Sequence, residues 1–231
     1  LHPRVRRQRQ MCIRDRTTEI KVARAALHFW EEPCISGEMG SGAVFFSGCA
    51  LHCVFCQNEN IANGTAGKVI STERLGEIFL ELQEKGANNI NLVTPGQFVP
   101  QIIKAVELAR NQNLKIPIVY NTSSYENVDT IRSLEGIVDI YLPDFKYFDT
   151  ALSAKYSHAP DYPAVAKAVI AEMVRQTGAA VFENGEDSLM KRGTIVRHLI
   201  LPGCTKDSKA VLKYLHETYE NQIYILSLIH I

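Results

Sequence analysis

Three cysteines lie within eight residues of one another, Cys49, Cys53 and Cys56, in the spacing Cys-x3-Cys-x2-Cys. A short loop can turn three thiolates at this spacing toward one centre, and thiolate sulfur is a ligand for soft metal ions and iron–sulfur clusters. The spacing therefore predicts a metal centre in the loop that holds these cysteines.

Two kinds of centre compete for this motif. A structural zinc site needs four ligands, usually from two paired knuckles. The sequence has no second knuckle, so zinc would need Cys34 or Cys204 as its fourth ligand, since His52 is adjacent to Cys53 and poorly placed. An iron–sulfur cubane can be held by three cysteines, which leaves one iron open to bind a second molecule. The spacing favours the three-cysteine cluster, with zinc and unligated thiols as alternatives.

The elements that position these thiols alternate between short apolar runs and amphipathic helical patterns. Strands are predicted at 42–47, 89–94, 116–121, 138–142, 193–201 and 222–225, and helices at 72–86, 97–111, 125–134, 161–177 and 207–219. This alternation predicts right-handed βαβ units and a parallel sheet. Near-continuous apolar strands fit a sheet that is covered on both faces.

Six such units suit either an open doubly wound sheet or an incomplete barrel. In both architectures ligands bind at the carboxyl ends of the strands. The candidate site loops are therefore 48–57, 94–96, 121–124, 143–146 and 202–204.

The cysteine motif, with Phe55 just before its last cysteine, resembles that of the radical S-adenosylmethionine (radical SAM) superfamily. Five stretches resemble more narrowly a branch similar to pyruvate formate-lyase activating enzyme. They are EPCISGEMGSGAVFFSGCALHCVFCQNENIA, NLVTPGQFVPQI, VYNTSSYE, DIYLPDFKY and RHLILPG. The likeness covers residues 32–225, the greater part of the chain.

The resemblance implies an α/β fold, an incomplete (β/α)6 barrel truncated at its C-terminus. It also implies a [4Fe–4S] cluster on Cys49, Cys53 and Cys56, with S-adenosylmethionine on the open iron. Reduced flavodoxin or ferredoxin would supply an electron that cleaves the sulfonium. The 5′-deoxyadenosyl radical would then abstract hydrogen from a glycyl-radical protein or a small molecule. The alternative class is a non-catalytic metal-binding or electron-transfer module, with zinc or a fully ligated cluster.

Phe55 is expected to pack under the cluster, and by the same resemblance its backbone would also meet the adenine; the plainer interpretation is a core aromatic only. Thr94, Pro95 and Gly96 stand where the superfamily usually has a Gly-Gly-Glu run that binds the methionine amino group. The Glu is missing here, so a backbone carbonyl would have to accept from the ammonium. The alternative is a simple Pro-Gly turn.

Polar residues after the third and fourth strands are further candidates for cofactor binding. Asn121 and Ser123 share a strand face by the period of two, and they suit hydrogen bonds to a ribose or carboxylate, or ordinary turn chemistry. Asp144 and Lys146 also share a face. They suit a substrate or the methionine carboxylate, or form a surface ion pair.

Arg197 interrupts the apolar run TIVRHLIL in the fifth strand. A buried guanidinium needs a partner, and a carboxylate is the natural bidentate one. The cofactor carboxylate is the favoured partner of Arg197, and Asp144 is its structural rival. His198, on the other face, and Cys204, just past the strand, are predicted to be packing residues.

The 231 residues have an ordinary globular composition, with 46% hydrophobic and 22% charged residues. No apolar run approaches the ~18 residues of a membrane span. The formal net charge is zero, but residues 1–16 hold six Arg and one Asp, which leaves 19 basic and 24 acidic residues elsewhere, a net charge of −5. No nucleic-acid footprint is therefore expected in the body. The clustered cysteines and the lack of a secretory apolar region before the body predict a cytoplasmic, reducing compartment.

The two ends resemble translated sequencing-adapter sequence, MCIRDR in the head and LSLIHI in the tail. We therefore predict a non-native head at 1–16 and a non-native tail at 226–231, both loosely attached. A nucleic-acid arm or an Arg-rich transit segment is the alternative for the head. Between the two ends, residues 17–41 are a lead-in and residues 42–225 the core domain.

Overall fold

The computed structural model describes residues 19–184 and 188–229. Its strands are β1 (Ile20–His28), β2 (Ser41–Phe46), β3 (Lys68–Ile70), β4 (Ile90–Val93), β5 (Ile118–Thr122), β6 (Ile140–Pro143), β7 (Val181–Phe182), β8 (Met190–Ile200) and β9 (Tyr224–Ile229). Its α-helices are α2 (Pro33–Ser36), α3 (Glu59–Ala62), α4 (Thr72–Glu84), α5 (Val99–Asn111), α6 (Val128–Arg132), α7 (Thr150–Ser157), α8 (Tyr162–Thr177) and α9 (Thr205–Tyr219), and a 3-10 turn, η1, covers Glu220–Gln222.

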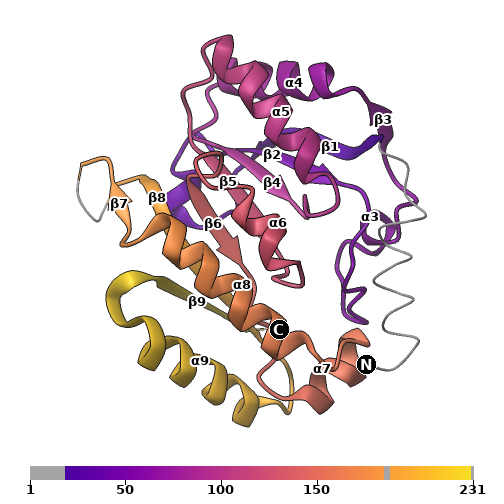
Figure 1. The fold of residues 1–231 in the computed structure, drawn as a ribbon, viewed down its shortest axis with the longest axis vertical. Helices are drawn as coiled ribbons and strands as arrows, with labels where there is room; N and C mark the ends of the chain where they lie inside the picture. Colours follow the sequence, from indigo (N-terminus) through magenta and orange to yellow (C-terminus); the bar gives the residue numbers. More distant parts are fainter. Residues whose placement is uncertain (1–18, 185–187, 230–231) are drawn as a thin grey trace.

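Six parallel strands form the centre of the molecule in the order β2-β4-β5-β6-β8-β9. Figure 1 shows the strands as a twisted sheet with helices packed along it. Within residues 19–184 and 188–229, the strand pairing does not close into a ring. The predicted α/β fold with a parallel, incomplete barrel is confirmed.

Three antiparallel strands extend this sheet and were not predicted. β1 pairs with β2, β3 pairs with β1, and β7 pairs with the start of β8. β1 lies in the segment interpreted as a lead-in, where Ile20 and Val22 are buried and the residues between and after them are not. Because β1 and β3 pair beyond β2, the parallel strand that leads to the cysteines is not an open edge.

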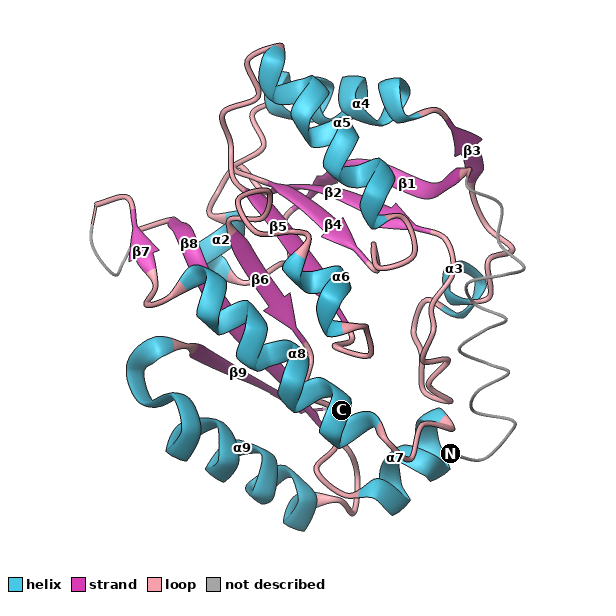
Figure 2. Cartoon of the chain, in the orientation of Figure 1, coloured by secondary structure: helices cyan, strands magenta, loops and turns pink. Residues whose placement is uncertain are grey.

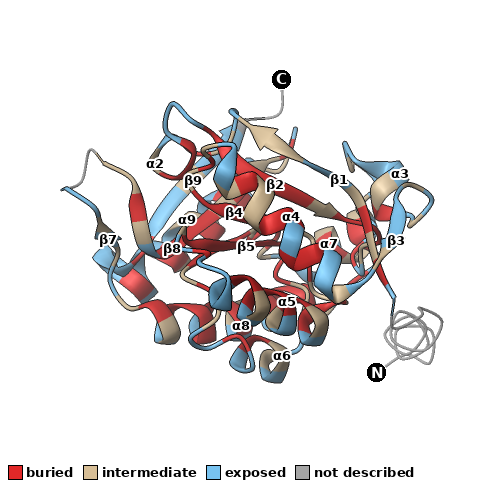
Figure 3. Cartoon of the chain, turned by 90° about the horizontal axis from the view of Figure 1, so that it is seen from above, coloured by how far each residue is buried: buried red, intermediate tan, exposed pale blue. Residues whose placement is uncertain are grey.

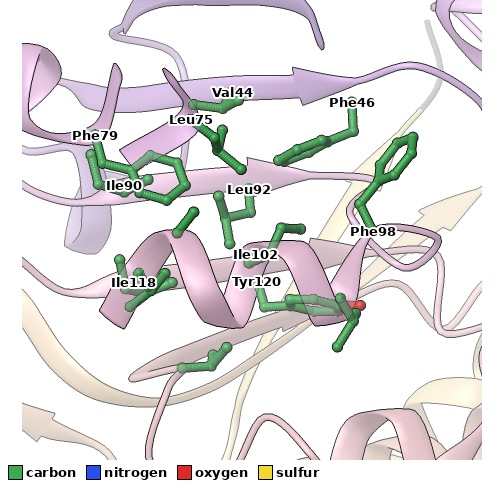
Figure 4. Packing of buried hydrophobic residues seen from close by; sticks show 14 of the residues in the cluster. Val44, Phe46, Leu75, Phe79, Ile90, Leu92, Phe98, Ile102, Ile118 and Tyr120 are labelled. Atoms are coloured by element: carbon green, nitrogen blue, oxygen red, sulfur yellow. The ribbon is translucent and has the colours of Figure 1, made fainter. Parts of the chain in front are cut away.

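The strands bury both of their faces, as the apolar runs predicted (Figure 3). The outer face packs against α4 and α5, which Figure 4 shows with Leu75, Phe79 and Ile102 lying over Ile90 and Leu92. The inner face holds a smaller cluster of Ile35, Val119, Ile140, Leu142, Met190 and Ile195. This inner cluster includes Ile35 from the short helix α2.

A third apolar cluster packs against the cysteine loop and draws its residues mainly from α7, α8 and α9 and the segments next to them. Figure 2 shows where these three helices lie. Its fully buried aromatic members are Phe145, Tyr147 and Tyr162. The sequence did not predict α7. The N-terminus of α7 is capped by Asp149, whose carboxylate accepts from the backbone nitrogens of Ala151 and Leu152.

The predicted head lies outside the described residues. The tail does not attach loosely up to residue 229, because β9 continues through it and pairs with β8, with Leu226 opposite Arg197 and Leu228 opposite Leu199. That part of the prediction is wrong, since an apolar, β-prone run next to an unpaired strand edge forms a ladder whatever its origin. Its non-native origin stays a prediction. None of the helices described is long and apolar enough to span a bilayer.

Candidate functional site

The predicted site loops lie at the carboxyl ends of the parallel strands. The cysteine loop leaves β2 at Ser47 and folds back onto α3, where the Gly48 and Cys49 nitrogens donate to the carbonyls of Ile61 and Ala62 at 2.7 and 2.9 Å. The loop that follows β4 is tied to it by Gln97, whose Nε2 donates to the carbonyls of Ser47 and Gly48 at 2.8 and 2.7 Å. Two neighbouring strand ends are therefore joined at the cysteines.

The cysteines at 49, 53 and 56 are free thiols, and all three are partly buried. Burial raises the pKa of the Cys49 and Cys53 thiols, while the positive charge of Lys146 acts in the opposite direction on both. The Leu51 nitrogen donates to Cys49 Sγ at 3.5 Å, and Ser157 Oγ donates to Cys53 Sγ at 3.1 Å. Each of these two sulfurs thus already accepts a hydrogen bond.

In residues 19–184 and 188–229, no three His, Cys, Asp or Glu side chains are gathered closely enough to hold a metal ion. The outer side of the cysteine loop is hollowed by about 190 Å³, lined by Cys53 and Cys56 together with His52 and Glu59. Bringing three sulfurs onto one centre therefore requires the loop to close, a change that metal binding itself can drive.

Phe55 packs on the third apolar cluster, with its ring edge-on to Tyr147 at a centroid distance of 6.4 Å. This contact fits the predicted packing position beneath the cysteine loop. The adenine contact of Phe55 stays a prediction.

The loop of Thr94, Pro95 and Gly96 lies against a carboxylate that the sequence did not single out, that of Glu126. A Cβ on Gly96 would come within 2.6 Å of Glu126 Oε2, so any larger residue would have to displace this carboxylate. Glu126 accepts hydrogen bonds from Tyr120 Oη at 2.7 Å and from the Thr122 hydroxyl. Burial raises the pKa of Glu126, although both hydrogen bonds lower it. The sequence signal that could have revealed Glu126 is its position beside Tyr125, shortly after the third predicted strand.

Arg197 contacts Asp144, the structural alternative to the cofactor carboxylate in the sequence analysis. Its Nε lies 3.0 Å from Asp144 Oδ1, and its Nη2 donates to Asn121 Oδ1 at 2.6 Å. Its Nη1 is 3.9 Å from Glu31 and 3.8 Å from Glu32, two carboxylates from the loop after β1 that the sequence did not reveal. The guanidinium is thus surrounded by acceptors of this chain. A contact of Arg197 with the cofactor stays a prediction.

The Asp144–Lys146 pair is present, at 2.7 Å, but it is not a surface pair, because both side chains are less than 20% exposed. Burial disfavours ionisation of Asp144, yet the charges of Lys146 and Arg197 outweigh it, so the pKa of this carboxyl is lowered. Glu31 has the opposite balance: burial, only partly offset by Arg197, raises its pKa to about 7.

Ser123 takes part in the site through its backbone carbonyl, which contacts the hydroxyl of Tyr162, a residue that the sequence did not single out. The Tyr162 hydroxyl, from α8, lies 3.0 Å from the Ser123 carbonyl and 2.9 Å from the Asp144 carbonyl. The same oxygen accepts from the Lys146 nitrogen at 2.9 Å. One buried phenol therefore joins the ends of β5 and β6, where four of the predicted residues lie.

We expect Tyr162→Phe to lower the free energy of unfolding by about 1–3 kcal/mol, because it leaves buried carbonyl and amide groups without a partner. Urea denaturation measures this loss. Tyr125→Phe is the matched control: its ring stacks on Tyr162, and its hydroxyl donates to Asp161 at 2.7 Å in a less buried place. An equal loss in both variants would contradict a special role for Tyr162.

Three comparisons with known proteins give a family model, a curated relative and a solved structure of similar fold. A family model described as the radical SAM superfamily matches residues 43–215, a span that holds every predicted site residue. The uncharacterized protein MJ0674 of Methanocaldococcus jannaschii is 25% identical over 183 residues, which cover 76% of this chain and 48% of that protein. The chain thus spans about half the length of this curated relative. The crystal structure of Streptococcus suis SuiB superposes with a TM-score of 0.52 at 12% identity, over 83% of this chain and 39% of that one, and this likeness concerns the fold alone.

Proposed function

This chain belongs to the radical SAM superfamily, and we propose that it is an enzyme whose Cys49, Cys53 and Cys56 hold a [4Fe–4S] cluster. Proteins of this superfamily use such a cluster together with S-adenosylmethionine. When bound, the two groups supply reductive cleavage of the sulfonium, which yields methionine and a 5′-deoxyadenosyl radical. The observation that carries the proposal is the set of three free thiols on one loop at the carboxyl edge of a parallel sheet.

The chemistry of the donor set fits this cluster. Free thiols from one short loop are suitable ligands for iron. A hydrogen bond from Ser157 to Cys53, and the positive charge of Lys146 close to Cys49 and Cys53, both favour the thiolate that a metal requires. The apolar cluster beneath the loop limits access of water from below.

We place the methionine end of the cofactor at the loops after β4, β5 and β6. Glu126 lies against Gly96 and supplies an acceptor for the ammonium at a loop that lacks the usual Glu. Lys146 offers the charge that a carboxylate needs. Thr94 and Pro95 offer backbone carbonyls, and Asn121 and Ser123 remain candidates for the ribose.

The resemblance to pyruvate formate-lyase activating enzyme supports the finer proposal that the radical is passed to a glycyl-radical protein, with a small-molecule substrate as the alternative. Reduced flavodoxin or ferredoxin would supply the electron, as the superfamily requires. A cytoplasmic location suits the free thiols of the described residues. Neither nucleic acid nor membrane is a proposed partner.

The proposal is tested by anaerobic reconstitution with iron and sulfide, addition of dithionite and S-adenosylmethionine, and detection of the products by mass spectrometry. We expect 5′-deoxyadenosine and methionine in equal amounts, and none when dithionite is left out. Production should rise with the true substrate, because a bound substrate excludes water from the site.

An added glycyl-radical polypeptide should acquire an organic radical that electron paramagnetic resonance detects. Cleavage without radical transfer would remove the activating role and keep the radical SAM activity. An intact, reducible cluster with bound S-adenosylmethionine and no cleavage would instead assign the chain to the non-catalytic modules, as would a colourless protein that holds only zinc.

A further inference from the structure

The sulfur of Cys53 stands at the end of a short row of buried hydroxyl groups. Ser157, the last residue of α7, places its Oγ 3.1 Å from Cys53 Sγ. Tyr147 places its hydroxyl 2.7 Å from Ser157 Oγ. Tyr147 and Ser157 are 0% and 3% exposed, so bulk water does not compete for the hydrogen bond between these two hydroxyls.

The direction of the row follows from the number of protons. A serine hydroxyl has one proton to donate and can accept at its oxygen. Since Ser157 donates to Cys53, its oxygen must accept from Tyr147. Burial raises the pKa of Tyr147 above its usual value, so the phenol retains the proton that it donates. The row therefore runs from Tyr147 through Ser157 to Cys53.

The protein holds both hydroxyls in place independently of the other two cysteines. The Val54 nitrogen donates to the Tyr156 carbonyl at 2.9 Å, which fixes the loop next to Cys53 against the last turn of α7. The Tyr147 ring packs edge-on against Tyr162, at 5.5 Å, and against Phe55. Closing the loop around a metal can therefore leave the contact at Cys53 unchanged.

We propose that Tyr147 and Ser157 form a hydrogen-bond relay that raises the reduction potential of the cluster through Cys53. This inference rests on the proposed function, because it requires Cys53 to be a ligand. A hydrogen bond to a ligand sulfur stabilises the more negatively charged, reduced state, and such bonds are among the factors that set iron–sulfur potentials. The hydrogen bond that Tyr147 donates polarises the Ser157 hydroxyl and so strengthens the hydrogen bond from Ser157 to the Cys53 sulfur. Both are positioning residues, since neither touches the reacting atoms.

The relay is tested by redox titration of the reconstituted full chain, with the reduced cluster followed by electron paramagnetic resonance and absorption. We expect a more negative midpoint potential for Ser157→Ala, a potential close to that of the unchanged protein for Ser157→Thr, and a smaller negative shift for Tyr147→Phe. Ser153→Ala is the matched control. The Ser153 hydroxyl is also buried and lies in the same helix, but it donates to the Thr150 carbonyl and not to sulfur. Its removal should leave the potential unchanged.

The outcomes separate this inference from the proposed function. A protein that takes up no iron–sulfur cluster overturns the proposed function, and with it the relay. A loaded Ser157→Ala protein with an unchanged potential overturns the relay alone. If Ser157→Ala does not load, the isosteric pair Ser157→Thr and Ser157→Val decides: a lower potential in Val supports the relay, and equal potentials overturn it.

Discussion

Serine in place of Cys49, Cys53 or Cys56, one at a time, should remove iron and colour from the reconstituted protein, whereas Cys34→Ser and Cys204→Ser should leave both in place. This is the largest effect that we expect. Three thiolates hold the proposed cluster, and a serine hydroxyl is not an equivalent ligand for its iron. The measurements are iron and sulfide content and the broad absorption near ~400 nm that dithionite bleaches.

The two control cysteines occupy different surroundings. Cys34 lies in α2 and packs against the inner cluster of the barrel. Cys204 immediately precedes α9 and packs on the same apolar cluster as Cys53, which makes it the stricter control. Iron loss in Cys204→Ser equal to that in Cys53→Ser would mean four cysteine ligands and no open iron, and the radical SAM proposal would fail.

The second large effect concerns stability. Arg197→Leu should lower the free energy of unfolding by about 3–5 kcal/mol, because it leaves the buried Glu31 and Glu32 carboxylates without their cation. Asp144 loses one cation but keeps its ion pair with Lys146. The guanidinium faces Asp144 directly and the Glu31 and Glu32 carboxylates at slightly longer range. Urea denaturation of Arg197→Leu and of the unchanged protein measures the difference. Adding Glu31→Gln to Arg197→Leu should recover part of the loss, since it removes one unpaired charge.

The pH dependence of this loss has a definite sign. The folded-state pKa of Glu31 is raised to about 7, from an ordinary value of 4.5. Its ionisation therefore opposes folding, and the stability that it contributes when protonated is lost as the pH rises from 4.5 through 7. The positive charge of Arg197 offsets part of the free-energy cost of ionising Glu31. Arg197→Leu should therefore lower the free energy of unfolding more at pH 8 than at pH 5. The same cost at both values would mean that Glu31 is not coupled to Arg197.

Affinity for S-adenosylmethionine distinguishes the two partners that the sequence allowed for Arg197. A role on the cofactor carboxylate predicts a loss of roughly 2–3 kcal/mol in binding free energy for folded, iron-loaded Arg197→Leu, the scale of a charged hydrogen bond. Unchanged affinity would mean that Arg197 has a structural role only, through its hydrogen bonds to Asp144 and Asn121.

The sequence was sufficient for whatever is local or periodic. The spacing of Cys49, Cys53 and Cys56 lies within a single loop, and each parallel strand is a continuous apolar run, so both were predictable. The spacing of Asp144 and Lys146 allowed an ion pair as one alternative, but not its burial. β1 was missed because its apolar residues alternate for only part of its length before the bulge opposite β2.

The remaining residues could not be predicted because their partners are distant along the chain. Ser157 meets Cys53 across 104 residues, and Tyr162 meets Ser123 across 39. A serine at the end of a short helix and a tyrosine at the start of a long one have ordinary local roles. Only the packing of α7 and α8 against the strand ends gives these two hydroxyls a relation to the site.

The 104 residues between Cys53 and Ser157 also set an order of events on the ribosome. At about 5–20 residues per second, the cysteine loop leaves the ribosome roughly 5–20 s before the helix that covers it. β2 and β4 can pair during this interval, because they are neighbours in the sheet and both precede α7 in the chain. The nascent thiols are therefore exposed to oxidants and to metal donors alike until α7 has docked.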